Sequence, residues 1–263
     1  MLPAPTVGVA ALASAAVALA AWRARSLTAG GAAAAAAVGT AVLAGAGWAG
    51  GAALAAFFIF ASFVSRVAPR SAPTADAKGD RRDAWQVLAN GAPAMIGAVA
   101  ASAGGALWLV TASLAAAAAD TWATAIGAWS TRPPRHLLTA RPVPPGTSGA
   151  VSLLGTAGAL VGALLVAAAG AWAGGDAALL PAATVLGFVG MVADSALGAA
   201  AQGRFRCPNC KLASERRVHR CGSPTIRVGG CAWLDNDGVN AIVTAAAAAA
   251  GWTAWAWLSR SPA

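Results

Sequence analysis

Eight apolar stretches, each long enough to cross a bilayer as a helix, restrict the fold of this sequence more than any other feature. A membrane-spanning helix needs about 17 to 25 predominantly apolar residues. Only 10% of the 263 residues are charged, whereas soluble domains average about 25%. We therefore predict an all-α polytopic membrane bundle, a single domain that covers residues 1–263. The predicted spans are 4–22, 28–46, 48–65, 86–103, 105–129, 149–173, 178–200 and 237–258.

The boundary between the second and third predicted spans depends on glycine alone. Residues 28–50 are almost entirely Ala, Gly and Val, so no polar loop separates the two spans. Glycines cluster between residues 45 and 51, and such clusters mark breaks in a helical pattern. We expect the chain to turn there.

The basic residues occupy alternate connections between the predicted spans. Of the 18 Lys and Arg residues, all except Arg260 follow the first, third, fifth or seventh span. Cytoplasmic loops carry an excess of Lys and Arg, so we predict that these connections are cytosolic and that both termini lie outside the inner (plasma) membrane. The net charge of +9 is then explained by loops that orient the helices in the membrane. Nucleic acid is therefore not an expected partner. Arginines follow the first span, which indicates a retained anchor and not a cleaved signal peptide.

Two aspartates, Asp120 and Asp194, lie inside predicted spans. A charged side chain at the centre of a bilayer costs about 2.5–3.5 kcal/mol on insertion scales and usually marks a functional site. Each aspartate is followed by a hydroxyl residue and then by small residues on the same helix face, which lets neighbouring helices approach closely. The alternative is that each aspartate pairs with an arginine or a backbone group only to hold helices together.

The predicted topology gathers more polar side chains at the cytosolic end of the bundle. The outer half has only Asp176, in a short turn. Several carboxylates facing a basic surface are suited to Mg²⁺ that bridges to phosphate groups. Besides the two intramembrane aspartates, the polar residues at the cytosolic end are Asn90, Asp235, Asp237 and Asn240.

The connection after the fifth span contains a turn of Gly146, Thr147, Ser148 and Gly149, preceded by three arginines. Backbone N–H groups in such a turn, leading into a helix N-terminus, attract phosphate. The turn lacks the Gly-Lys-Thr ending of a P-loop. The alternative is that Thr147 or Ser148 simply caps the following helix.

All four cysteines lie in residues 201–235, a predicted cytosolic loop between the last two spans. Cys207 and Cys210 form a Cys-x-x-Cys pair, and His219, Cys221 and Cys231 follow. Reducing conditions disfavour structural disulfides, and this set of residues is typical of a small zinc knuckle. We predict a structural Zn²⁺ bound by Cys207, Cys210 and Cys221, with His219 or Cys231 as the fourth ligand. A redox pair and unligated thiols are the alternatives.

Together these motifs resemble the membrane family known as domain of unknown function 92, which includes transmembrane protein 19 and plant phytyl-phosphate kinase. The resemblance covers about residue 30 to the end. At one position the sequence departs from the family, because Ala125 replaces the glutamate of the usual Ala-Thr-Glu-Ile-Gly. The similar segments are 57–58, 65–66, 82–91, 119–124, 145–149, 194–199, 207–210, 215–222 and 235–240.

The resemblance implies an isoprenoid lipid kinase. Such an enzyme phosphorylates a prenyl (phytyl-like) monophosphate to the diphosphate with CTP or ATP and Mg²⁺ at the cytosolic membrane face. The implied magnesium ligands are Asp120, Asp194 and Asp237, with Asp235 next, and Asn90 and Asn240 would position oxygens. The implied phosphate contacts are Arg66, Arg82, Gly146, Thr147, Ser148 and Gly149.

Two other classes of protein are compatible with the intramembrane aspartates. A proton- or cation-coupled secondary transporter also uses paired acids on similar helices. A transporter needs a midplane site reachable from both sides, however, and the polar residues here gather at one face. A scaffold protein, the third possibility, would need the aspartates for stability only.

Overall fold

The computed structural model describes residues 4–69, 81–101, 103–215, 217–219 and 221–260, and most of these residues are helical. The predicted helical architecture is confirmed. Four basic residues counted above, Arg70, Lys78, Arg216 and Arg220, lie outside the described residues. The helices of the described ranges are α1 (Val7–Arg23), α2 (Ala29–Val67), α3 (Ala84–Ala100), α4 (Ala103–Gly127), α5 (Leu153–Gly174), α6 (Leu179–Ala201) and α7 (Asn236–Leu258).

Most of these helices are long enough to cross a membrane. Within the described ranges, α2, α4, α5, α6 and α7 satisfy both the length and the apolarity expected of a membrane span. α1 and α3 have 17 residues each, which is the lower end of the range for spanning helices.

The 39-residue helix α2 is folded back on itself at Gly47. This glycine has non-helical backbone angles, φ 65° and ψ −161°. Arg66, near the end of α2, donates hydrogen bonds to Ala24 O (3.1 Å) and Ser26 Oγ (2.6 Å), just before α2 begins. A straight helix of this length would separate its ends by about 58 Å. The two halves therefore run antiparallel, with the break inside the predicted glycine cluster.

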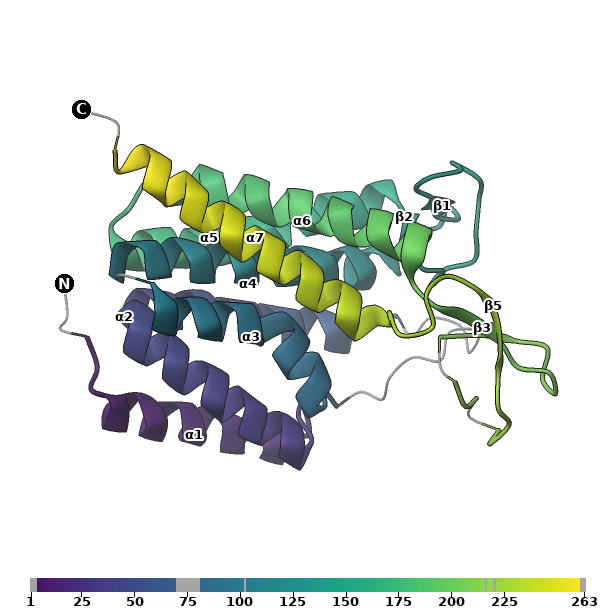
Figure 1. The fold of residues 1–263 in the computed structure, drawn as a ribbon, viewed down its shortest axis with the longest axis horizontal. Coiled ribbons are helices and arrows are strands. Elements are labelled where there is room, and N and C mark those ends of the chain that lie inside the picture. The colour runs from purple at the N-terminus through teal and green to yellow at the C-terminus, as the bar shows by residue number, and fades with distance from the viewer. Residues whose placement is uncertain (1–3, 70–80, 102, 216, 220, 261–263) are drawn as a thin grey trace.

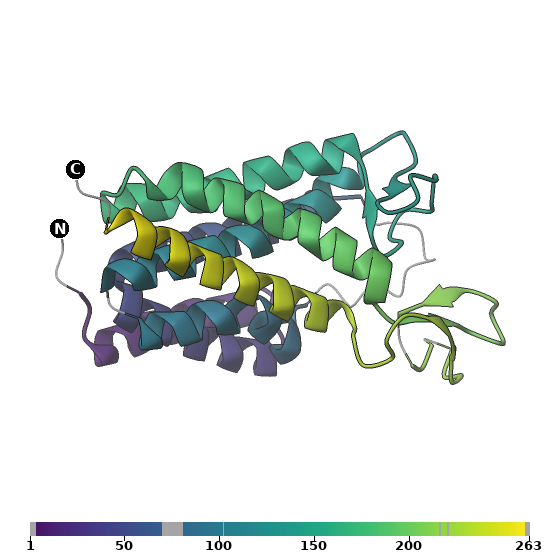
Figure 2. The ribbon, with the colours of Figure 1, turned by 45° about the horizontal axis from the view of Figure 1, so that its top comes forward.

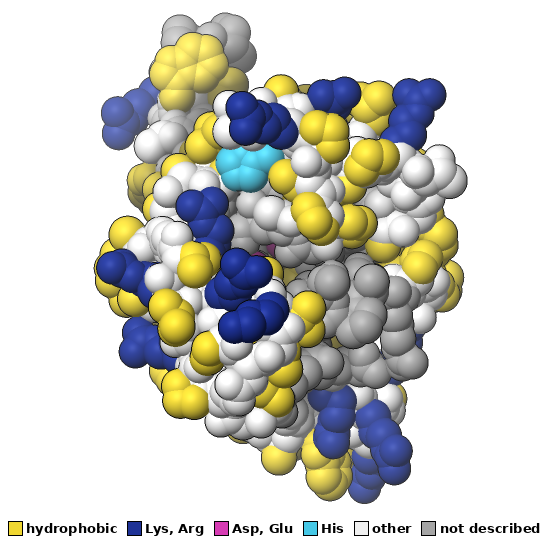
Figure 3. Space-filling view, turned by 90° about the vertical axis from the view of Figure 1, so that its right-hand side faces the viewer, with side chains coloured by type: hydrophobic (Ala, Val, Ile, Leu, Met, Phe, Trp, Pro, Cys, Tyr) yellow, Lys and Arg dark blue, Asp and Glu magenta, His cyan; other side chains and the backbone are white. Residues whose placement is uncertain are grey.

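The two ends of the bundle differ in character. Both termini lie at one end, and the loops with short strands lie at the other, which we call the loop end (Figure 1). Lys and Arg side chains are scattered over the loop end, where little acidic surface is visible (Figure 3). α4 lies in the middle and contacts α2, α3, α5, α6 and α7 (Figures 1 and 2). The chain thus concentrates basic charge at one end of the helices, as the alternating pattern predicted.

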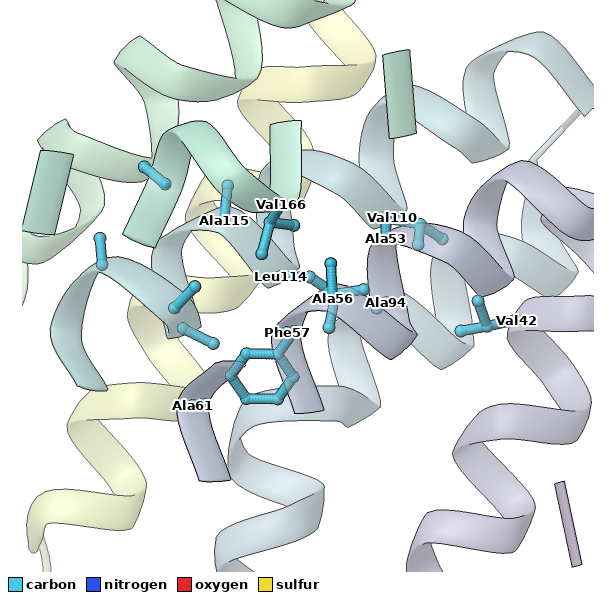
Figure 4. Packing of buried hydrophobic residues seen from close by; sticks show 14 of the residues in the cluster. Val42, Ala53, Ala56, Phe57, Ala61, Ala94, Val110, Leu114, Ala115 and Val166 are labelled. Atoms are coloured by element: carbon cyan, nitrogen blue, oxygen red, sulfur yellow. The ribbon is translucent and has the colours of Figure 1, made fainter. Parts of the chain in front are cut away.

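The interior is built from small side chains. Residues 112–119 of α4 are all buried, and most of them are alanine. Ala53 and Ala56 of α2 and Ala94 of α3 lie close to Leu114 of α4 (Figure 4). Membrane helices associate through close packing of such residues, because lipid is as apolar as the protein surface. Many large apolar side chains instead face outward, as for Trp172, which is 90% exposed.

Short strands occur in two loops at the loop end, which the all-α prediction did not include. Between α4 and α5, β1 (Arg135–His136) pairs antiparallel with β2 (Ala150–Val151). Between α6 and α7, β3 (Arg204–Arg206), β4 (Ala213–Ser214) and β5 (Ile226–Gly229) form an antiparallel sheet in the order β4-β3-β5. These strands give each loop a short sheet of its own beside the helix ends.

Candidate functional site

Asp120 and Asp194 are brought together by two helices that run side by side. α4 and α6 both run from the end with the termini toward the loop end (Figures 1 and 2). A side chain at Gly190 would lie 2.7 Å from Ala116 Cβ, so glycine is required for this close approach. One further turn along each helix leads to the aspartates, whose carboxylates interact electrostatically. We call these two residues the carboxylate pair.

The carboxylate pair requires a cation or a proton in these surroundings. Both residues are partly buried, and Asp194 Oδ2 is buried without a hydrogen-bond partner among the described residues. Like charges in apolar surroundings repel each other and lose hydration. Mg²⁺ is often bound by one or two carboxylates plus phosphate oxygens, so the pair fits this ion. No backbone group holds this oxygen of Asp194, in contrast to the helix-pairing alternative.

The two predicted amides lie on different helices, Asn240 on α7 and Asn90 on α3. Val243 of α7 packs against α6, and Asn240, one turn nearer the loop end, is only 6% exposed. Thr244 Oγ1 donates a hydrogen bond to Ala89 O (3.0 Å). This bond ties α7 to α3 beside Asn90, which is partly buried. Asn90 Nδ2 donates to Gln86 O (2.9 Å) within its own helix, so of the two predicted amides only Asn240 is placed beside α6.

The acids at the start of α7 lie apart from the pair. Asp235 is exposed, and as the N-cap it accepts a hydrogen bond from Gly238 N (2.9 Å). Asp237 is partly buried in the first turn. Among the described residues, the carboxylates form no group of three within metal-binding distance. The structure therefore joins two of the predicted magnesium ligands, Asp120 and Asp194, and does not add Asp235 or Asp237 to them.

The glycine turn, residues 146–149, packs against α6 one helical turn beyond Asp194. Gly149 has a φ of 74°, and a side chain there would lie 2.4 Å from Ala199 Cβ. A side chain at Gly198, four residues after Asp194, would lie 3.4 Å from Gly149 N. Residues four apart share a helix face. The turn therefore lies next to the face of α6 that carries Asp194.

The alternative interpretation, in which Thr147 or Ser148 caps the next helix, is wrong. The N-cap of α5 is Ser152, whose Oγ accepts a backbone hydrogen bond at 3.1 Å. Thr147 Oγ1 donates to Pro144 O (2.7 Å), and Ser148 Oγ donates to Glu215 Oε1 (2.6 Å). The reason is that β2 separates the turn from the helix, so α5 starts at Leu153 and not at the predicted residue 149.

Arg66 and Arg82 both stabilise the connection between α1 and α2. The guanidinium of Arg66 bonds that connection directly. Arg82 does so through its backbone, because Arg82 N donates to Ser26 O (3.0 Å) and Thr28 N donates to Arg82 O (3.0 Å). The guanidinium of Arg82 lies 5.8 Å from the centre of the Phe57 ring. Burial lowers the pKa of Arg82 from its ordinary value, but arginine stays charged in proteins, so Arg82 is suited to hold an anion.

A largely apolar cavity of about 480 Å³ lies between α1, both halves of α2, and α3. Its polar lining includes Arg82, Gln86 and Asn90, at or near the start of α3. Small-molecule sites have volumes of about 300–1,000 Å³. Sequence reasoning missed this cavity, because the Ala and Gly residues around it are equally typical of close helix packing. It could accommodate an apolar chain with an anionic end beside Arg82.

The loop between α6 and α7 brings together Cys207, Cys210, His219 and Cys221. Their ligand atoms all lie within 4.8 Å of one another, and no other such group of three or more occurs in the described residues. Cys231 is not part of it, because Cys231 N pairs with Ala201 O (2.8 Å) at the base of the loop. His219 is thus the fourth member of the set, which we call the metal-ligating group.

Hydrogen bonds separate the pKa values of two thiols in this group. Bonds with Ser223 and His219 lower the pKa of the Cys221 thiol to about 6. The bond with Cys221 raises the pKa of the Cys210 thiol to about 11. Because the thiolate is the form that binds metal, Cys221 is the thiol best prepared to do so at neutral pH.

The fold and the helix-held acids define an integral membrane protein with a polar site at one end of its bundle. The chain belongs to the DUF92 family of integral membrane proteins, whose model matches residues 12–248. An uncharacterized membrane protein of Methanocaldococcus jannaschii is 34% identical over 148 residues, which are 56% of this chain and 62% of the relative. The match thus covers less than two thirds of that relative. No solved structure matches the chain.

Proposed function

We propose that this protein is a membrane-embedded isoprenoid lipid kinase that converts a prenyl monophosphate to the diphosphate with CTP or ATP. The observation that carries the proposal is the position of the carboxylate pair, one helical turn from the glycine turn at the basic end of the bundle. The proposal includes eight membrane crossings, with the loop end in the cytosol and both termini outside. Nucleotide and lipid phosphate then meet on the same side of the membrane.

The chemistry requires little more than this arrangement offers. An oxygen of the prenyl monophosphate attacks the γ-phosphorus of the nucleotide. The bond from that phosphorus to the β,γ-bridging oxygen breaks, and its electron pair leaves with the nucleoside diphosphate. The acceptor is already an anion, so a strong general base is not needed. Phosphoryl transfer depends mainly on positioning and charge neutralisation.

Each part of the proposed site has a separate role. Asp120 and Asp194 would hold Mg²⁺, which when bound supplies positive charge beside the phosphate oxygens. The glycine turn would hold phosphate oxygens through the N–H groups of Ser148 and Gly149, since Ala150 N already donates to the backbone within the turn. Asn240 would orient a phosphate oxygen from α7. These roles follow from burial and position around the carboxylate pair.

We place the prenyl chain in the cavity between α1, α2 and α3. Its lining is mostly apolar, and Arg82 lies at the polar part of its wall, so chain and phosphate would each meet matching chemistry. An amphipathic acceptor would then enter from the lipid and keep its phosphate at the loop end. The acceptor and the nucleotide would approach the site from different directions.

The direct test is a transfer assay on purified protein in nanodiscs. Labelled CTP or ATP, Mg²⁺ and a panel of prenyl monophosphates should give labelled prenyl diphosphate. Asp120→Asn should remove the activity. Asp176→Asn is the matched control, because Asp176 lies at the opposite end, where it accepts a hydrogen bond from Trp108 Nε1 (2.7 Å); it should retain activity. Absence of product over the whole panel, with proton or cation flux in liposomes, would instead support the transporter class.

The cavity assignment has its own test. Ala52→Phe adds a ring to the cavity wall and should raise KM for long-chain acceptors several-fold while short-chain acceptors are less affected. Ala33→Phe is the control, because Ala33 is exposed on the same helix and does not line the cavity. An equal effect of both substitutions on all chain lengths would contradict the assignment.

A further inference from the structure

The metal-ligating group is built from two similar turns. In the first turn, Cys210 N donates a hydrogen bond to Cys207 Sγ (3.4 Å), and Lys211, which follows, has a φ of 61°. In the second turn, His219 and Cys221 are followed by Gly222, with a φ of 82°. Each turn thus presents two ligands and then reverses the chain through a left-handed residue. Such paired turns hold four side chains on one centre without a helix or an apolar core.

The geometry and the chemistry of the group fit Zn²⁺. In a tetrahedral site with Zn–S bonds of about 2.3 Å, ligand atoms are about 3.8 Å apart. Cys207 Sγ and Cys221 Sγ are 3.6 Å apart, and all four ligand atoms lie within 4.8 Å of one another. Three thiolates and one imidazole are a common ligand set for structural zinc. Disulfides would need S–S contact, and the cysteines are free.

The loop that carries this group contacts the glycine turn directly. Glu215 lies between the two ligand turns, and its Oε1 accepts the hydrogen bond from Ser148 Oγ at 2.6 Å. The base of the loop is held at the ends of α6 and α7, since Gly203 N donates to Leu234 O (2.8 Å). The position of Glu215 therefore depends on the fold of the metal-ligating segment on both sides of it.

We propose that Cys207, Cys210, His219 and Cys221 bind one Zn²⁺, and that this ion holds Glu215 against Ser148 and so fixes the glycine turn over the end of α6. The ion is structural, because all four coordination positions are taken by the protein. Without it, the segment has almost no buried apolar side chains to maintain its shape. The metal-ligating loop then acts as a clamp, by which we mean that it holds the glycine turn in place. This role does not depend on which substrate the protein binds.

Metal content tests the first half of the proposal. Full-length protein carrying a tag without histidine should contain about one zinc per chain by mass spectrometry. Cys210→Ser and Cys221→Ser should lower zinc affinity by at least the roughly 10–100-fold lost when an outer-shell partner is mutated. Cys231→Ser is the matched control from the same loop and should keep the ion. Zinc that is absent, or that is lost equally from all three variants, would overturn the assignment.

Thiol accessibility gives a second measurement on the unmodified chain. Cys210 and Cys221 are exposed, so in the metal-bound protein they should react with a maleimide much more slowly than their exposure suggests. A zinc chelator should release both thiols, and added Zn²⁺ should protect them again. Rapid modification of both before chelation would contradict zinc binding, even if a variant failed to fold.

Limited trypsin digestion tests the clamp, because Arg135, which is followed by His136 and not by proline, lies in the loop that ends in the glycine turn. Chelation should speed cleavage there several-fold. Glu215→Ala should have the same effect with zinc still bound, and chelation of that variant should add little. Glu215→Gln, which keeps an acceptor oxygen, should protect the loop almost as well as the native residue. Unchanged cleavage after complete zinc removal would overturn the clamp. These readouts need no substrate, so they are independent of the proposed kinase activity.

Discussion

The carboxylate pair and the metal-ligating group both gather ligand atoms, but the chain brings them together in opposite ways. Asp120 and Asp194 are far apart in the sequence and meet because α4 and α6 pack closely at glycine and alanine. The metal-ligating group comes from one loop, folded by two tight turns. The first site is positioned by helix packing, whichever cation or proton neutralises its charge. The second has few apolar contacts of its own and depends on what it binds.

This difference has a consequence for stability. Removing charge from the carboxylate pair relieves repulsion in apolar surroundings and leaves the packing intact, so the fold should tolerate it. Removing a ligand from the metal-ligating group takes away the interaction that organises the loop. One site should therefore lose function without losing stability, and the other should lose local structure first.

The largest effect is expected from Asp194→Asn. Losing one preorganised electrostatic contact costs about 10²–10³ in kcat, and we expect a loss of transfer activity of at least this size. The melting temperature should stay the same or rise, because the repulsion between the two carboxylates is removed. Activity and thermal unfolding in detergent measure the two effects. A lower melting temperature with full turnover would mean that the aspartate serves only to hold helices.

The next largest effect is expected at Gly149 of the glycine turn, compared with Gly222 of the metal-ligating loop. Both glycines have left-handed backbone angles, with a φ of 74° at Gly149 and 82° at Gly222, so alanine is strained at either position. At Gly149 the new side chain would also lie 2.4 Å from Ala199 Cβ, whereas at Gly222 there is open space. The strained backbone costs about 1–2 kcal/mol, and overpacking adds about 1–3 kcal/mol. Unfolding measurements should therefore show the larger loss for Gly149→Ala. Equal losses would mean that the turn does not pack on α6.

The smallest effect is expected from substituting two serines of the loop between α4 and α5. Ser152→Ala removes the N-cap of α5 and should destabilise the protein by about 1 kcal/mol. Ser148→Ala should change the free energy of unfolding by less than about 0.5 kcal/mol, since its hydrogen bond is exposed. It should nevertheless increase trypsin cleavage of the loop. If Ser148→Ala were the more destabilising change, the loop would contribute to the global fold.

Features set by nearby residues could be predicted. The helices follow from the apolar stretches, and the break in α2 follows from the glycine cluster, because Gly47 can adopt angles closed to other residues. Cys207, Cys210 and Cys221 were predicted as one group from their spacing. Even the basic loop end follows from the order of spans and arginines. Each of these depends on contacts within a short segment or on the solvent around it.

Features set by packing between distant segments could not be predicted from the sequence. The sequence left His219 and Cys231 as equal candidates, and the attachment of Cys231 to the loop base decided between them. Thr147 and Ser148 were predicted as possible helix caps, but residues 150–151 pair with β1, so the helix begins only at Leu153. Asp237 was predicted as a third magnesium ligand, but the described carboxylates form no group of three within metal-binding distance.

By itself, the sequence determined that this protein is a helical membrane protein, which end of the bundle is basic, and which residue types are available for its sites. Hydropathy and charge decide these properties through the bilayer, without reference to partners in the chain. Only the tertiary structure decided that Asp120 meets Asp194, that Glu215 meets Ser148, and that α1, α2 and α3 enclose a cavity. These contacts depend on the register between helices and on their close approach at single glycines. Neither property is encoded in a local sequence pattern.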